Sequence, residues 1–180
     1  MSVSQAFLEK AYLAYFGRPI DPNGVAWYTQ PQMTEAQVER EFSASAESQS
    51  LYGEGFTITQ INLIYNVLFG RDGDVAGMTW WANQVAQHLV TPAGAAIAIL
   101  NGAQGSDKIA VENKLAASHA FTAGIDTTEE ILGYSGDAAN AVARDFLASI
   151  TSTPATPAQV NAAIAASVAA GTALPPEPEP

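Results

Sequence analysis

Residues 12–28 read YLAYFGRPIDPNGVAWY, and residues 65–81 read YNVLFGRDGDVAGMTWW. Shifting one stretch by 53 positions aligns it with the other and gives seven identities within the 21 positions from Leu8 to Tyr28. The identical pairs are Tyr12 and Tyr65, Phe16 and Phe69, Gly17 and Gly70, Arg18 and Arg71, Asp21 and Asp74, Gly24 and Gly77, and Trp27 and Trp80. So many matches among uncommon residue types indicate a duplicated unit.

Each copy has the pattern of a helix, a short loop and a second helix. Apolar residues at helical spacing lead up to Gly17, and glycine is common just past a helix end. Asp21 can cap the next helix, and Pro22 fits its first turn. Gly24 leaves room for the two helices to cross closely. The predicted structural motif comprises Phe16, Gly17, Arg18, Asp21, Gly24, Phe69, Gly70, Arg71, Asp74 and Gly77.

The loops of the two copies differ in charge, because the first reads Arg18-Pro-Ile-Asp21 and the second Arg71-Asp-Gly-Asp74. Each arginine lies near a helix C-terminus, which favours positive charge, and could also reach the capping aspartate three residues on. Asp72 and Asp74 could give two oxygen ligands to calcium, which takes six to eight. The alternative is a solvated turn in which Asp74 serves only as the cap.

The adjacent aromatic residues of each copy allow two interpretations. Trp27, Tyr28, Trp80 and Trp81 can close the helix crossing as packing residues, or they can stack on a sugar ligand. Adjacent aromatic residues on a helix rarely both point inward, so one ring of each pair is expected to face solvent. We expect those exposed, ligand-binding rings to be Tyr28 and Trp81.

Helical signals continue along the rest of the chain, and no alternating stretch is long enough to predict a sheet. Thr34 and Gln37, and Thr57 and Gln60, have the spacing of capping boxes, the first opening a helix to about Ala46. The sequence predicts an all-α bundle of about eight or nine short helices in a single domain, residues 1–172. Repeat units at about 4–32 and 57–86 precede an Ala-rich helical half at about 91–171, and residues 173–180 form a Pro/Glu-rich linker or tail.

Composition restricts the function. The net charge is -11 with only seven Lys and Arg residues, which argues against nucleic acid, and there is no cysteine for a disulfide scaffold or thiolate metal site. No run of apolar residues is long enough for a transmembrane helix, and the N-terminus lacks the shape of a signal peptide. The sequence contains no nucleophile-elbow, phosphate-loop or His-Glu-x-x-His motif, so we expect a protein that is not an enzyme and has no cofactor, calcium excepted.

The Phe-Gly-Arg, Asp-x-x-Gly and aromatic-pair pattern resembles a bacterial helical domain of unknown function, and its unit is similar to phycobilisome linker domains. The downstream segments 112–114, 120–122 and 134–139, which read ENK, AFT and YSGDAA, look like the second half of the same family. The resemblance covers most of the chain from Leu8 to Thr151. It implies the N-terminal module of a large secreted surface-layer or RTX-type protein, exported by type I secretion.

That resemblance also implies a location and a partner. A related module anchors a surface layer to lipopolysaccharide, so we expect a cell-surface protein that binds this polysaccharide, with calcium assisting, and continues into a larger C-terminal region. The alternatives are a structural module that assembles with copies of itself or with other proteins, and an unrelated intracellular scaffold.

Overall fold

The computed structural model describes residues 3–52, 57–90 and 92–172, and over these residues it contains eleven α-helices and no strand. The all-α prediction is therefore confirmed, while the predicted tail at residues 173–180 lies outside the described residues. The helices are α1 (Gln5–Phe16), α2 (Pro22–Tyr28), α3 (Glu35–Ala44), α4 (Ala46–Tyr52), α5 (Ile58–Phe69), α6 (Val75–Ala86), α7 (Pro92–Asn101), α8 (Gly105–Gly124), α9 (Thr128–Gly133), α10 (Gly136–Ser149) and α11 (Pro157–Thr172).

The described residues form more helices than the eight or nine expected, and α4 shows why. The helix predicted from Thr34 to about Ala46 ends at Ala44, because Ser45 adopts an extended conformation with ψ of 149°. The Ser45 hydroxyl donates to the carbonyl of Phe42 and accepts from the amide of Ser48, so one side chain ends α3 and starts α4. Such competition between a serine and the helix backbone is local and easy to overlook in a sequence.

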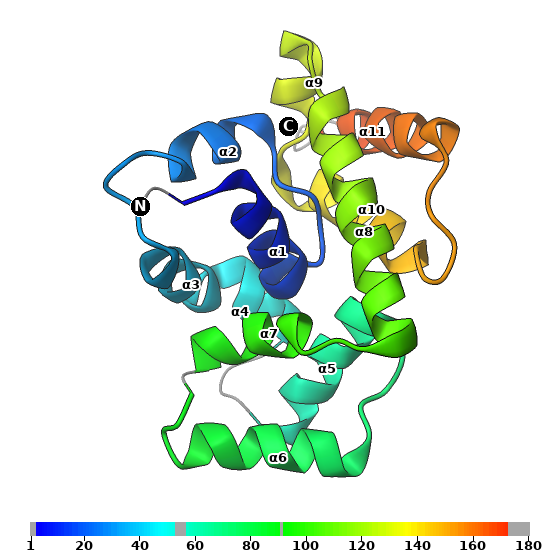
Figure 1. Ribbon diagram of the computed structural model, residues 1–180. Helices are drawn as coiled ribbons and strands as arrows, with labels where there is room; N and C mark the ends of the chain where they lie inside the picture. Colours follow the sequence, from blue (N-terminus) through cyan, green and yellow to red (C-terminus); the bar gives the residue numbers. More distant parts are fainter. Residues whose placement is uncertain (1–2, 53–56, 91, 173–180) are drawn as a thin grey trace, which may run out of the picture.

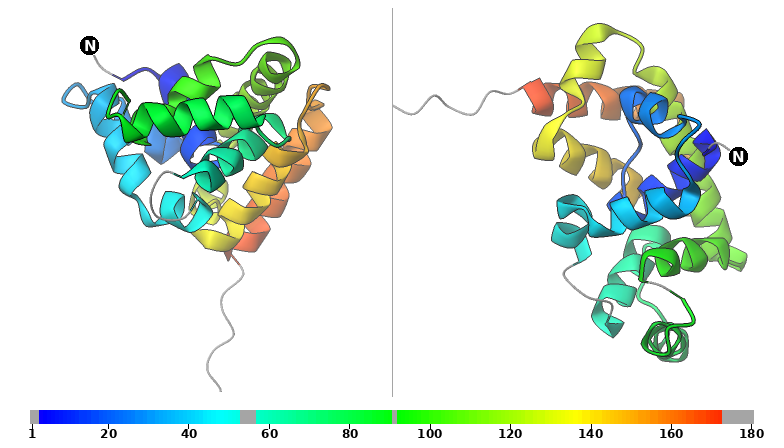
Figure 2. Two further views of the ribbon diagram at one scale, coloured as in Figure 1. Left: turned by 90° about the horizontal axis from the view of Figure 1, so that it is seen from below. Right: turned by 90° about the vertical axis from the view of Figure 1, so that its left-hand side faces the viewer.

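Two clusters of buried residues hold the helices together. The larger one contains residues of α1, α3, α5 and α7, and the smaller one joins the end of α8 to α9, α10 and α11. The long helix α8 contributes to both clusters, and Phe146 of α10 packs against both. Figures 1 and 2 show α6 at one end of the molecule and α9 at the other, with α8 running between these two ends. None of the helices described is long and apolar enough to cross a membrane.

Lys114 of α8 is completely buried between the two halves of the molecule. Its ammonium group donates to the carbonyl of Leu147, near the C-terminus of α10, where the helix dipole favours positive charge. No ion pair of Lys114 is present among the described residues. Burial lowers the pKa of this lysine to about 8.

The stability of the protein is therefore expected to rise with pH between about 7.5 and 9.5. In this range the folded chain loses the Lys114 proton, while the unfolded chain, with an ordinary lysine pKa of about 10.4, keeps it. The unfolded state then binds more protons, and the free energy of unfolding increases by about 1–2 kcal/mol. Urea unfolding at the two pH values measures this increase.

The Lys114→Met variant is the control, because methionine fills similar space without a titratable group. It is expected to lose the rise with pH, and an equal rise in both proteins would exclude Lys114 as its source. The range stops below pH 10 because burial also raises the pKa of Tyr12, Tyr15 and Tyr52, so tyrosine ionisation favours the unfolded state at higher pH.

Candidate ligand-binding site

In both copies of the repeat, the tyrosine of the first helix contacts the phenylalanine of that helix and the arginine that follows it. Tyr12 and Phe16 meet edge to face with ring centroids 5.0 Å apart, and Tyr65 and Phe69 do so at 5.3 Å. The guanidinium carbon of Arg18 lies 5.1 Å from the Tyr12 ring centroid, and that of the equivalent Arg71 lies 5.6 Å from the Tyr65 centroid. Each arginine also donates to the carbonyl of the residue that follows it.

The glycines and aspartates of the motif have the predicted positions. Gly17 and Gly70 end α1 and α5 with φ of 64° and 69°, a left-handed conformation that strains residues with a side chain. Asp21 and Asp74 each accept a hydrogen bond of 2.8 Å from the amide three residues on.

Gly24 and Gly77 leave space for a tyrosine hydroxyl of the preceding helix. An added Cβ at Gly24 would lie 3.1 Å from the hydroxyl oxygen of Tyr12, and one at Gly77 would lie 3.2 Å from that of Tyr65. The close crossing of the two helices therefore depends on the absence of a side chain here, as the sequence predicted.

The arginines do not pair with the capping aspartates, and this expectation was wrong. Arg18 instead binds both carboxylate oxygens of Glu47 on α4, at 2.7 and 2.8 Å, and Arg71 binds both oxygens of Asp107 on α8, at 2.9 and 2.5 Å. The aspartates are occupied by helix amides. Sequence reasoning missed Glu47 and Asp107 because they lie 29 and 36 positions from their arginines.

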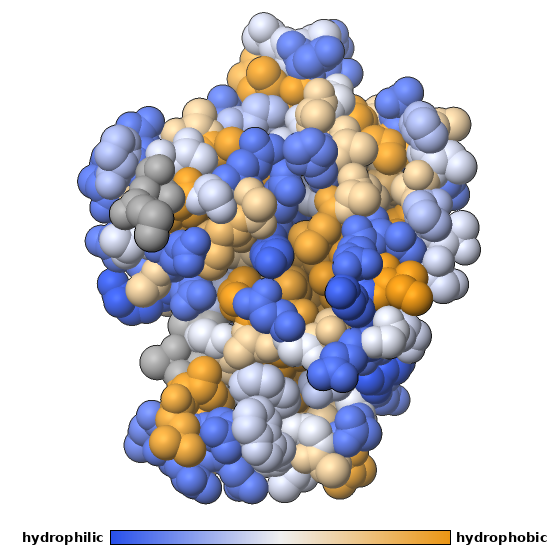
Figure 3. Space-filling model, viewed as in Figure 1, coloured by the Kyte–Doolittle hydropathy of each residue, from blue (hydrophilic) through white to orange (hydrophobic). Residues whose placement is uncertain are grey.

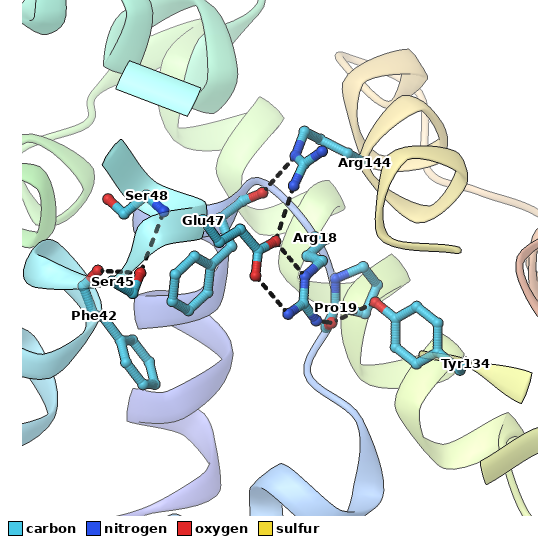
Figure 4. A network of polar contacts seen from close by, with 9 residues as sticks. Arg18, Pro19, Phe42, Ser45, Glu47, Ser48, Tyr134 and Arg144 are labelled. Carbon is cyan, nitrogen blue, oxygen red and sulfur yellow. Dashed lines mark hydrogen bonds and ion pairs between the residues drawn. The ribbon is translucent and has the colours of Figure 1, made fainter. Parts of the chain in front are cut away.

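The first unit is enclosed by the rest of the chain, as Figure 4 shows. Glu47 lies between Arg18 and Arg144 of α10, whose guanidinium donates to Glu47 at 2.9 Å and to the carbonyl of Phe16 at 2.9 Å. Tyr134, which follows α9, donates from its hydroxyl to the carbonyl of Pro19 at 2.7 Å. As a result the Arg18 side chain is only 10 % exposed. Burial alone would lower its pKa, but the hydrogen bonds and charge of Glu47 reverse this and raise it.

The second unit is open. A pocket of about 240 Å³ adjoins Arg71, whose side chain is 44 % exposed. Its lining combines aromatic rings of the repeat with charged groups and residues at and after the end of α7. The lining residues are Tyr65, Phe69, Arg71, Asp74, Trp81, Ile99, Gly102, Ala103, Gln104 and Asp107.

Two rings that pack beside the first unit, Phe42 and Tyr134, have no counterpart among the residues that line this pocket. In the first unit Tyr28 packs edge-on against Phe42 at 5.0 Å, and Tyr134 lies beside Arg18. In the second unit, Gly102 and Ala103 line the pocket. Because they have little or no side chain, the pocket beside Trp81 stays unfilled.

The exposed rings of the aromatic pairs are Trp27 and Trp80, and the expectation that they would be Tyr28 and Trp81 was wrong. Trp27 is 68 % exposed and Trp80 is 52 % exposed, whereas Tyr28 and Trp81 pack against the larger core cluster. Consecutive residues on a helix point about 100° apart, and here the second residue of each pair faces the core. Trp81 nevertheless lines the pocket, and its ring meets Trp80 edge to face at 4.7 Å.

Asp72 and Asp74 both accept hydrogen bonds from groups of the second unit. One oxygen of Asp72 accepts hydrogen bonds from the amides of Asn62 and Asn66, both at 2.9 Å, and these bonds lower its pKa. Asp74 caps α6. Within residues 3–52, 57–90 and 92–172, no group of three or more His, Cys, Asp or Glu residues is placed to hold a metal ion.

Two other pockets lie on the described surface. One of about 430 Å³ lies between α4 and α10 and includes Ala46, Asn140 and Arg144. Another of about 300 Å³ lies between α1, α7 and α8 and includes Lys10 and Lys108. Neither contains an aromatic ring, whereas the pocket of the second unit unites predicted aromatic residues with charged groups.

Part of the chain, including the second unit, matches a known protein family. Residues 39–104 match the domain of unknown function DUF4214. The match covers less than half of the chain, a narrower stretch than the expected resemblance from Leu8 to Thr151, but it includes the whole second unit. Every residue lining the pocket of that unit, except Asp107, lies within the match. Searches of curated proteins and of solved structures returned no significant match.

Proposed function

We propose that this chain is a non-catalytic module that anchors a larger secreted bacterial protein to the cell surface by binding the polysaccharide of lipopolysaccharide. The observation that carries the proposal is the pocket of the second unit. It combines three aromatic rings with an arginine and two aspartates, and such a combination suits sugars, because rings stack on their apolar faces while charged groups bind their hydroxyls.

Two further features support binding at a surface. Trp80 is 52 % exposed beside Trp81, so it extends the aromatic wall out to solvent. The net charge of -11 would repel an anionic membrane surface, and calcium is the ion we propose to bridge the two. Calcium is therefore proposed as an aid to anchoring.

A second candidate function is assembly with copies of itself or with another protein. Apolar side chains are exposed along α6 and the connection that follows it, with Val75 at 77 % and Leu89 at 67 % exposure. Figure 3 shows a hydrophobic patch over this connection between α6 and α7. Light scattering at rising protein concentration, with and without polysaccharide, separates assembly from sugar binding.

Binding to immobilised lipopolysaccharide, with and without calcium, tests the anchoring proposal. The wild-type chain is expected to bind lipopolysaccharide that carries its polysaccharide, and calcium is expected to strengthen the binding. Trp81→Ala is expected to weaken it about tenfold or more, because an aromatic contact is lost from the pocket wall.

Trp27→Ala is the matched control, because it removes the exposed ring of the first unit and does not touch the pocket. Its binding is expected to equal that of the wild type. Absence of binding in both conditions, or equal loss in both variants, would contradict the proposal.

A further inference from the structure

The first unit holds a tyrosine ring beside its arginine, and the second unit has a pocket beside the equivalent arginine. Tyr134 donates to the carbonyl of Pro19, and its ring centroid lies 5.9 Å from the guanidinium carbon of Arg18. Burial raises the pKa of Tyr134 to about 12, Arg18 lowers it, and the charges of Asp21 and Glu47 raise it further. The charges of one arginine and two carboxylates therefore act on this phenol.

The second unit places the same three charges around its pocket. Arg71 and Asp74 are the equivalents of Arg18 and Asp21 at the 53-residue offset. Asp107 takes the role of Glu47, since it binds two nitrogens of the arginine through both carboxylate oxygens. All three line the pocket, and no ring of the described chain enters it as Tyr134 enters the first unit.

We propose that the pocket of the second unit binds one uncharged pyranose ring, in the position that the Tyr134 phenol occupies beside Arg18 in the first unit. This inference rests on the proposed function and specifies its ligand. A pyranose, like a phenol, is a six-membered ring that carries a hydroxyl group. The pocket volume of about 240 Å³ is below the ~300 Å³ at which pockets for drug-sized ligands begin, which suits a single ring.

The charges of the pocket favour a ligand without a negative charge. Arg71 is already neutralised by Asp107, and Asp74 adds a further negative charge to the lining. Each carboxylate has about four lone-pair sites, so Asp74 and Asp107 can accept hydrogen bonds from sugar hydroxyls in addition to those they already accept. An anionic sugar would meet an excess of negative charge here.

A second copy of the described chain offers no exposed tyrosine to fill the pocket. All six tyrosines lie within the described residues, and each is buried or half-buried, so none can reach into a neighbour's pocket. A tyrosine of another protein is an alternative occupant of the pocket, because it has the same ring as Tyr134. The probe N-acetyltyrosinamide distinguishes it from a sugar.

Titration of the full chain with small probes tests this inference. The probes are methyl glucoside, methyl mannoside and methyl galactoside, with glucuronic acid and N-acetyltyrosinamide for comparison. Calorimetry and tryptophan fluorescence, to which Trp27, Trp80 and Trp81 all contribute, measure the binding. At least one neutral glycoside is expected to bind and to change that fluorescence. Glucuronic acid is expected to bind more weakly.

Ala103→Leu fills the pocket, and also narrows the pocket between α1, α7 and α8 that Ala103 lines, and it is expected to weaken glycoside binding about tenfold or more. Ala46→Leu makes the same change at the pocket between α4 and α10, and it is expected to bind as the wild type does. Equal thermal midpoints and circular dichroism spectra of the two variants establish that both are folded. Unchanged binding by Ala103→Leu would overturn the inference.

The probes also separate this inference from the function on which it rests. Lipopolysaccharide binding that survives Ala103→Leu would leave the anchoring proposal in place and overturn the pocket as its site. Binding of N-acetyltyrosinamide with no neutral glycoside bound would overturn the sugar and indicate a protein partner. Tighter binding of glucuronic acid than of the glycosides would overturn the uncharged ligand class.

Discussion

The Glu47→Ala variant is expected to lose about 3–5 kcal/mol of its free energy of unfolding, as measured by urea titration. Glu47 is the partner that two arginines share, and the Arg18 side chain is 10 % exposed. Removal of the carboxylate leaves a positive charge buried against Tyr12 and Phe16 without a counter-charge. The cost is mainly that of an uncompensated buried charge, rather than of a lost attraction.

The repeat provides a matched control for this prediction. Asp107→Ala breaks the same two-oxygen contact in the second unit, but the Arg71 side chain is 44 % exposed and water can solvate it. A loss of about 0–1 kcal/mol is expected there. Similar losses in the two variants would show that burial of Arg18 is not what makes Glu47 important.

Phe42→Ala is expected to destabilise the fold by a similar amount, about 3–5 kcal/mol. Phe42 of α3 is 2 % exposed and contacts four other rings, with centroid distances from 4.8 to 6.1 Å. Truncation leaves a cavity among these rings and removes their edge-to-face contacts. Those rings belong to Tyr12, Tyr15, Phe16 and Tyr28.

Phe42→Leu keeps most of the apolar volume and is expected to cost about 1–2 kcal/mol. Trp80→Ala removes a ring that is 52 % exposed, and a change within about 0.5 kcal/mol is expected for it. A Phe42→Ala loss as small as that of Trp80→Ala would mean that the ring cluster contributes little to stability.

Local features of the fold could be predicted from the sequence because they depend on neighbouring residues. The left-handed helix ends at Gly17 and Gly70, and the caps at Asp21 and Asp74, each involve residues within four positions of one another. The repetition supports these assignments, since two copies with the same rare residues require the same geometry.

The candidate site could be predicted only in part, because its polar partners come from distant segments. Trp81, Arg71 and Asp74 were all identified from the repeat, and all three line the pocket. Asp107 and the glycine and alanine that leave the space open belong to a different part of the chain. Which ring of each aromatic pair is exposed depends on helix rotation, and a shift of one residue reverses that assignment.

The hydrogen bonds of Tyr134 and Arg144 to residues near Arg18 span 115 and 128 positions. Contacts between residues so far apart in sequence raise the contact order and slow folding. The first repeat unit cannot reach its native surroundings until residues beyond Arg144 have been synthesised. A nascent chain that stops earlier leaves the groups around Arg18 in water, so these contacts form only after the chain has been made as far as α10.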